Sequence, residues 1–115
     1  MIKKAVWLSY DLGIGGDYPG LYKWLDNHKA IECGNSIAFF YYQIKKTNSD
    51  ELVSLITEDI EKCVRLRSGD RLYVIRLEHI EETPKIMGRF IYGSRRSNPW
   101  EGYGDSKSTE SEEGI

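Results

Sequence analysis

The chain has 115 residues, of which 40% are hydrophobic and 30% charged, and this size and composition predict one domain with its own core. No apolar run approaches the roughly 20 residues that span a bilayer, and the apolar stretch after Lys3 and Lys4 ends too early for a signal peptide. We therefore expect a cytoplasmic protein with no membrane partner.

The net charge of −2 is uneven, since residues 104–115 hold four acids and one lysine, which leaves the rest of the chain at +1. A nearly neutral body gives no general electrostatic reason to expect a nucleic-acid partner.

The first half of the chain predicts a strand, a helix and a hairpin. Residues 4–10 are nearly continuous in apolar character, which favours a central strand. Three glycines follow in a loop, and Asp17 then occupies the position of a helix N-cap, which predicts a helix over 18–27. Short strands are expected at 30–33 and 36–44, joined by a tight turn at a glycine-asparagine pair.

The second half predicts a helix and two further strands. Asn48 with Glu51 three residues later has the spacing of a capping box, so the helix begins near 48 or 49. Its buried stripe is formed by Leu52, Ile56, Ile60 and either Cys63 or Val64, widened by Leu55. Strands are expected at 71–77 and 85–92, separated by a polar, turn-like segment from His79 to Pro84.

The element order predicts the fold class and the domain organisation. It reads β-α-β-β-α-β with one added C-terminal strand, which is typical of an α+β, ferredoxin-like fold with two helices on one face of an antiparallel sheet. The predicted domain spans residues 1–93, an arm spans 94–103, and an acidic disordered tail spans 104–115. The two cysteines, Cys33 and Cys63, fit reduced, buried thiols better than a disulfide framework, and with two histidines they show no zinc spacing.

Short motifs along the first two thirds of the chain resemble those of a known family. They are Ser9-Tyr10-Asp11-Leu12, Gly16-Asp17-Tyr18-Pro19-Gly20-Leu21-Tyr22, Ile31-Glu32-Cys33, Ser36-Ile37-Ala38-Phe39-Phe40 and Gly69-Asp70-Arg71-Leu72-Tyr73-Val74-Ile75. Together they resemble the SinR-like proteins, small relatives of the CRISPR-associated adaptation endoribonucleases and of the VapD toxins, over residues 4–77. The resemblance implies a ferredoxin-like subunit that forms a homodimer. It also implies that an Asp at the end of the first strand faces its twin across the dimer axis, where a divalent metal assists phosphodiester cleavage.

Asp11 alone matches that position, which makes it the candidate catalytic residue and metal ligand. Two copies of the carboxylate would hold one Mg²⁺ or Mn²⁺, an ion that prefers oxygen ligands and would activate water beside a phosphate. The glycines at 13, 15 and 16 would let a phosphate backbone approach closely. The alternative hypothesis is that Asp11 accepts hydrogen bonds from the loop amides and stabilises the turn.

A second candidate surface interleaves cations and aromatic residues. Its candidate binding residues are Arg89, Tyr92, Arg95, Arg96 and Trp100, to which Tyr10 beside Asp11 is added. Such a pattern is found in proteins that bind single-stranded nucleic acid, but aromatics and arginines are also favoured at protein interfaces. The sequence therefore predicts a dimeric protein that acts on RNA or DNA, as a metal-dependent endoribonuclease or as a binding subunit. The alternative is a non-enzymatic interaction or nucleic-acid-binding protein that uses the C-terminal arm.

Overall fold

The computed structural model describes residues 2–45 and 49–105, without the side chains of residues 49 and 50. The elements follow the order β1 (Ile2–Asp11), α1 (Tyr18–Asn27), β2 (Ile31–Glu32), β3 (Ile37–Ile44), α2 (Ser49–Cys63), β4 (Arg71–Ile80) and β5 (Thr83–Tyr92). The predicted cap at Asn48 and residues 106–115 of the predicted tail lie outside the described residues.

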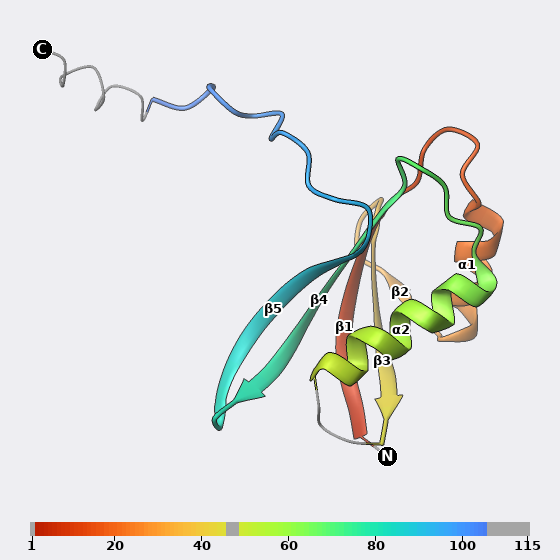
Figure 1. The fold of residues 1–115 in the computed structure, drawn as a ribbon, viewed down its shortest axis with the longest axis vertical. Coiled ribbons are helices and arrows are strands. Elements are labelled where there is room, and N and C mark those ends of the chain that lie inside the picture. The colour runs from red at the N-terminus through yellow and green to blue at the C-terminus, as the bar shows by residue number, and fades with distance from the viewer. Residues whose placement is uncertain (1, 46–48, 106–115) are drawn as a thin grey trace, which may run out of the picture.

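The strands form one antiparallel sheet in the order β2-β3-β1-β4-β5. This confirms the predicted α+β class with an antiparallel sheet and two helices, and it is compatible with a ferredoxin-like arrangement. In Figure 1 the β4–β5 hairpin diverges from the other strands, and the chain beyond Tyr92 runs away from the body without forming a helix or strand up to residue 105. The added C-terminal strand is therefore the edge strand of the sheet.

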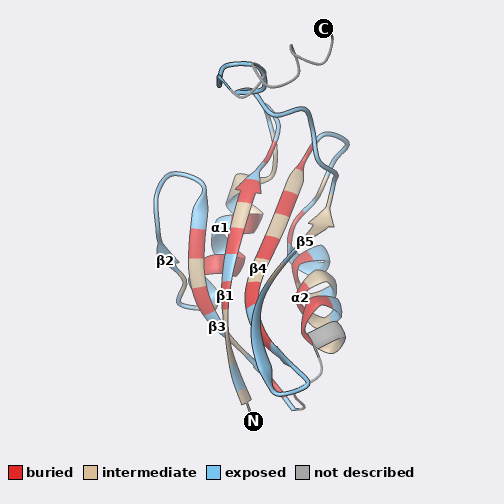
Figure 2. Ribbon diagram, turned by 90° about the vertical axis from the view of Figure 1, so that its left-hand side faces the viewer, coloured by how far each residue is buried: buried red, intermediate tan, exposed pale blue. Residues whose placement is uncertain are grey.

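The core lies on one side of the sheet because side chains alternate between its two faces. Figure 2 shows buried residues alternating with more exposed ones along β1, β3 and β4. The inward side chains of these strands form a single cluster with Leu21, Trp24 and Leu25 of α1 and with the stripe of α2. Both helices therefore cover the same face, and we call the opposite face the helix-free face.

The two helices match their predicted surfaces closely. On α2 the predicted stripe is buried, with Val64 rather than Cys63 completing it. Asp17 caps α1, since its carboxylate accepts a hydrogen bond from the Gly20 amide at 3.0 Å. The same carboxylate accepts a second bond, from the Arg65 amide at 2.8 Å, which ties the start of α1 to the chain after α2. No described helix is long and apolar enough to cross a membrane.

Two predictions about local structure are wrong. Cys33 and Cys63 are free, as predicted, but both are exposed rather than buried. The segment predicted as a turn over 79–84 is mostly strand, because β4 continues to Ile80 and β5 begins at Thr83. The connection is a two-residue turn in which Glu81 and Glu82 both have positive φ, 53° and 66°. Such turns usually carry Asn or Gly, so a Glu pair gives no sequence signal.

Candidate functional site

Asp11 ends β1 on the helix-free face and is held there by an arginine of the neighbouring strand. It pairs in the sheet with Arg71, whose Nη2 donates to Asp11 Oδ2 at 2.8 Å. The Asp11 side chain remains 54% exposed and that of Arg71 is 27% exposed. The pair is therefore a surface ion pair that fixes the direction of both side chains but stabilises the fold little.

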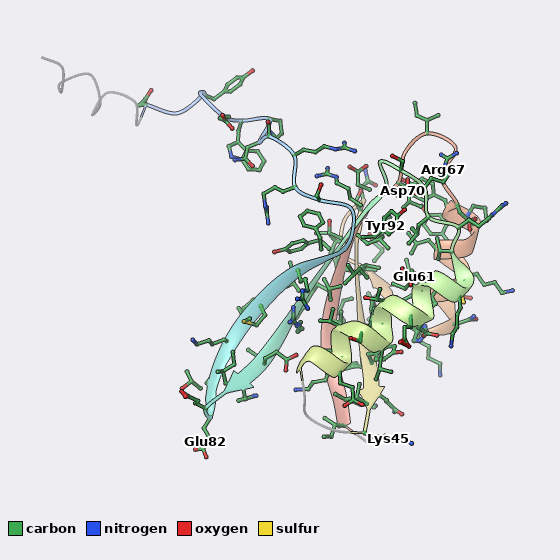
Figure 3. The ribbon with its side chains drawn as sticks, in the orientation of Figure 1. Lys45, Glu61, Arg67, Asp70, Glu82 and Tyr92 are labelled. Carbon is green, nitrogen blue, oxygen red and sulfur yellow. The ribbon has the colours of Figure 1, made fainter. Side chains whose placement is uncertain are left out.

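The alternative hypothesis for Asp11, that it binds the loop amides, is wrong because another carboxylate occupies that role. Asp70 is 1% exposed, and its two oxygens accept from the amides of Gly13 and Arg67, each at 2.8 Å. Figure 3 shows Asp70 beside Arg67 at the end of the molecule that carries the glycine loop. Asp70 thus joins the loop after β1 to the loop after α2, and Asp11 is left facing the surface.

A hollow of about 360 Å³ opens beside Asp11 on the helix-free face, and we call it the Asp11 hollow. It is lined by Ser9, Asp11, Ile37, Arg71, Tyr73, Ile75, Phe90 and Arg95. Tyr73 and Phe90 form its aromatic wall, with ring centroids 4.7 Å apart. The hollow combines one carboxylate, two guanidinium groups, the hydroxyls of Ser9 and Tyr73, and an aromatic surface.

Arg95 enters this hollow from the root of the C-terminal arm. Its guanidinium carbon lies 5.4 Å from the Phe90 ring centre and 5.8 Å from that of Tyr73, a cation–π arrangement. Room for the Tyr73 ring is provided by Gly88 on β5, where an added Cβ would lie 2.7 Å from ring atoms of Tyr73. The backbone of β5 therefore helps to position the aromatic wall.

The structure brings together only two of the seven predicted site residues, Asp11 and Arg95. Tyr10 and Tyr92 pack against the core on the helix-covered side. Burial raises the pKa of Tyr10, with smaller contributions from the neighbouring Tyr22 and Tyr18. Arg89 is exposed and pairs with the inward residue Val74, so it too lies away from the hollow.

The remaining two predicted residues belong to the arm. Arg96 Nη2 donates to the Gly69 carbonyl at 2.9 Å, which anchors the root of the arm beside the loop before β4. Trp100 is 69% exposed in a turn of the arm. Neither contributes to the Asp11 hollow.

Sequence reasoning missed the residues that β4 and β5 contribute to the hollow: Arg71, Tyr73, Ile75 and Phe90. The available signal was the alternation along β4, which places Arg71, Tyr73 and Ile75 on one face. That alternation does not reveal which face the helices cover, because both faces of β4 carry apolar residues.

Two glycines of the loop after β1 line a different hollow from Asp11. Gly15 and Gly16 line a separate hollow of about 490 Å³ with Arg65 and Arg67, and Arg67 Nη2 donates to the carbonyl of Ile14 at 2.6 Å. The expectation that the glycines at 13, 15 and 16 let a phosphate backbone approach closely stays a prediction.

The donor set around Asp11 fits a divalent metal poorly within one chain. Mg²⁺ takes six oxygen ligands, with at least one carboxylate free to coordinate. Here one oxygen of Asp11 already accepts from Arg71, and the other side-chain oxygens of the hollow are the hydroxyls of Ser9 and Tyr73. The described residues contain no group of three or more His, Cys, Asp or Glu side chains placed to hold a metal ion.

A second polar cluster joins α1, α2 and β3 on the helix-covered side. Asp59 accepts from Trp24 Nε1 at 3.1 Å and from the Tyr42 hydroxyl at 3.4 Å, and it lies 3.4 Å from His28 Nε2. Burial, and after it the charge of Asp59, raises the pKa of Tyr42 to about 12. The His28 ring is stacked between Trp24 and Tyr42, so this histidine is part of the packing.

The structure thus brings arginines, hydrogen-bonding groups and aromatic rings together in the Asp11 hollow. Comparison of the chain with protein-family models, with curated proteins and with solved structures gives no match.

Proposed function

We propose that this protein binds nucleic acid through the Asp11 hollow, on a fold of ferredoxin-like topology. The βαββαβ order, the strand order β2-β3-β1-β4 and the placement of both helices on one face support this topology. The observation that carries the function is the convergence of Arg71 and Arg95 on the aromatic wall of Tyr73 and Phe90. Guanidinium groups pair with phosphates, and flat rings stack on bases.

The free hydrogen-bonding capacity of Arg71 supports the same proposal. Its Nη2 is engaged by Asp11, whereas among the described residues its Nε has no hydrogen-bond partner although it is buried. A buried donor without a partner is costly, and a ligand could supply the missing acceptor if the Arg71 side chain turned to expose its Nε. Phosphate oxygens are acceptors of the kind that an arginine fork binds best.

The test is binding of a fluorescently labelled oligonucleotide measured by anisotropy. We expect Arg95→Ala and Arg71→Ala each to weaken binding about tenfold, equivalent to about 1.4 kcal/mol. Arg89→Ala is the matched control, because Arg89 is an exposed arginine that lies away from the hollow. If Arg89→Ala weakens binding as much as Arg95→Ala does, the cations act without the hollow and the proposal fails.

A metal-dependent ribonuclease is the second candidate, and the exposure of Asp11 favours it. Its carboxylate is 54% exposed on the helix-free face, where the same face of a second copy can approach and bring a second carboxylate. The protein would then be a homodimer, and Arg71 would have to release Asp11. The test is cleavage of labelled RNA with Mg²⁺ or Mn²⁺, with and without a chelator, by the wild type and by Asp11→Asn. Cleavage that Asp11→Asn performs equally well, or a monomeric mass in solution, excludes this candidate.

A further inference from the structure

A groove of about 370 Å³ lies between α1 and β2 on the helix-covered side of the sheet, and we call it the α1–β2 groove. Figure 2 shows β2 at the edge of the sheet, beyond β3. The residues that line the groove are Tyr10, Tyr22, Leu25, Asp26, Ala30, Ile31, Glu32 and Ala38. None of them lines the Asp11 hollow, which lies on the opposite face.

Two carboxylates stand on facing walls of the α1–β2 groove. On α1, Asp26 follows Tyr22 by four residues, so these two side chains are neighbours on one side of the helix. On β2, Glu32 pairs with Ala38, and directly paired residues of a sheet share a face. Since Ala38 is buried in the core, Glu32 also lies on the helix-covered side, across the groove from α1.

Two tyrosine rings form a corner of the groove. The rings of Tyr10 and Tyr22 have centroids 6.4 Å apart and an interplanar angle of 78°. Tyr22 is 53% exposed, so its ring is accessible to a cation that enters the groove, and an aromatic face attracts a cation. Burial raises the pKa of the Tyr10 hydroxyl, and after the neighbouring Tyr22 and Tyr18 the charge of Glu32 raises it further. This last contribution indicates a negative potential at the floor of the groove.

The two charged residues that line the groove are both acidic. Within the described part of the chain, neither Asp26 nor Glu32 forms an ion pair. One oxygen of Glu32 accepts from the Gly34 amide at 3.1 Å, which directs the carboxylate and leaves its second oxygen for a ligand. The groove therefore favours a cationic occupant and repels a phosphate.

The shape and lining of the groove favour a guanidinium group on an alkyl chain. A guanidinium group is planar, stacks on an aromatic face and carries N–H donors that can reach carboxylates on two sides. The apolar side chains of Leu25, Ile31 and Ala38 would cover the methylene groups of the chain. A volume of about 370 Å³ is at the low end of the range for small-ligand pockets, about 300–1,000 Å³, so it suits one side chain.

We propose that the α1–β2 groove binds an arginine side chain of a partner protein, with its guanidinium group stacked on Tyr22 and hydrogen-bonded to Asp26 and Glu32. The rim favours a protein over a free small cation, because Ile31 is 61% exposed beside the groove and a protein segment would cover this apolar surface. The inference goes beyond the proposed function. The groove and the Asp11 hollow lie on opposite faces and carry opposite charge, so neither site depends on the other.

The experiment titrates blocked glycine-X-glycine tripeptides into the isotope-labelled full chain and follows its backbone amide resonances by NMR. X is arginine, lysine or citrulline, which is a neutral isostere of arginine, and butylguanidinium is the free-cation probe. We expect the arginine probe to bind about tenfold more tightly than the citrulline probe, because the carboxylates stabilise a charged donor more than a neutral one. The lysine probe is expected to bind about threefold more weakly than the arginine probe, because an ammonium group cannot stack as a guanidinium group does.

Substitutions separate the ring from the carboxylates. Tyr22→Leu is expected to weaken binding of the arginine probe about fivefold, equivalent to about 1 kcal/mol, whereas Tyr22→Phe keeps the ring and is expected to bind as the wild type does. Asp26→Asn and Glu32→Gln are each expected to weaken binding about tenfold. The matched controls are Tyr41→Leu, at a 56% exposed tyrosine of the helix-free face, and Glu61→Gln, at an exposed acid of α2. Thermal unfolding of each variant checks that the fold is kept.

Each contrary outcome overturns the inference in a different way. If the citrulline probe binds as tightly as the arginine probe, or if no probe binds the wild type, the groove is not a cation site. If Glu61→Gln weakens binding as much as Asp26→Asn does, the probe responds to overall charge and not to the groove. If butylguanidinium binds while the arginine tripeptide does not, the partner is not a protein. Tyr22→Leu is expected to leave oligonucleotide affinity unchanged, so the proposed function is tested separately.

Discussion

At the scale of single residues, three aspartates of similar sequence context have different roles. Asp11 ends a strand and remains at the surface, Asp17 caps a helix, and Asp70 is buried between two loops. What separates them is the set of donors each meets: a guanidinium for Asp11, and pairs of backbone amides for the other two. Backbone amides are fixed in place, so the carboxylates of Asp17 and Asp70 have structural roles. The carboxylate of Asp11 is available for function.

Asp70→Asn is expected to lower the free energy of unfolding by about 2 kcal/mol, because the amide leaves one buried backbone N–H facing another donor. The measurement is urea unfolding followed by circular dichroism. Asp11→Asn serves as the comparison and is expected to cost less than about 1 kcal/mol, since its ion pair is exposed. Equal midpoints for wild type and Asp70→Asn would contradict the role of Asp70 in joining the loops.

Asp17 predicts a pH dependence of stability. Hydrogen bonds from the Arg65 amide, and after it the Gly20 amide, lower the pKa of Asp17 below its ordinary value of 3.8. A carboxyl with a lowered folded-state pKa stabilises the protein fully above its unfolded pKa and loses that contribution as pH falls through the folded pKa. The wild type is therefore expected to unfold at higher temperature than Asp17→Asn at pH 7, with the difference shrinking below about pH 4. A difference that stays constant down to pH 3 would show that the ionised form is not what stabilises the cap.

At the scale of elements, the contact between α1 and α2 is set by a glycine. An added Cβ at Gly20 would lie 2.7 Å from the carbonyl oxygen of Cys63, close to the Asp17 carboxylate as well. The first turn of α1 can therefore approach the end of α2 only because position 20 has no side chain. This close approach also explains how the Asp17 carboxylate reaches the Arg65 amide.

Gly20→Ala is expected to destabilise the protein by about 1–3 kcal/mol, the range for overpacking. The sign of the change in the free energy of unfolding is informative, because a Gly→Ala change within a helix usually stabilises a protein by up to about 1 kcal/mol. Gly13→Ala is the matched control, since its added Cβ would make only an ordinary contact, 3.7 Å from Asp70 Oδ1. Thermal unfolding of the two variants measures both effects, and a Gly20→Ala protein at least as stable as Gly13→Ala would refute the packing argument.

At the scale of the whole molecule, the sheet separates a helix-covered core from an open surface. The chain has a net charge of −2, yet the helix-free face carries Lys3, Arg71 and Arg95 against one acid. Overall charge therefore conceals the local field that a ligand would meet. This is why the composition gave no reason to expect nucleic acid, while the geometry supports a proposal of nucleic-acid binding.

The number of cations on this face predicts a weak salt dependence of the proposed oligonucleotide binding. Each phosphate neutralised in a single strand contributes about −0.7 to the slope of log K against log salt concentration. Three cations therefore predict a slope of about −2 for the wild type, and Arg95→Ala is expected to reduce its magnitude by about 0.7. Anisotropy titrations at several salt concentrations measure these slopes, and a slope several times steeper would place the binding surface elsewhere.

The sequence by itself determined most of the secondary structure, because the signals are local. Helix α1 has the predicted bounds 18–27, the stripe of α2 is buried as expected, and Asp17 caps its helix. The Glu81–Glu82 turn was missed because the preference for positive φ is read from Asn and Gly, not from Glu. Asp11 was identified as a candidate carboxylate at a strand end, but its partner Arg71 was not.

Only the tertiary structure decided which groups meet. Trp7 and Ile75 are as apolar as the core residues beside them, so periodicity in β1 and β4 does not show which face the helices cover. Because the helices cover one face of the sheet, the outward residues lie on the other face: Ser9, Asp11, Tyr73 and Phe90. The sheet register then brings residues some 60–80 positions apart in the sequence into one hollow. Whether Asp11 or Asp70 accepts hydrogen bonds from the loop amides depends on the same long-range packing, which no local sequence pattern contains.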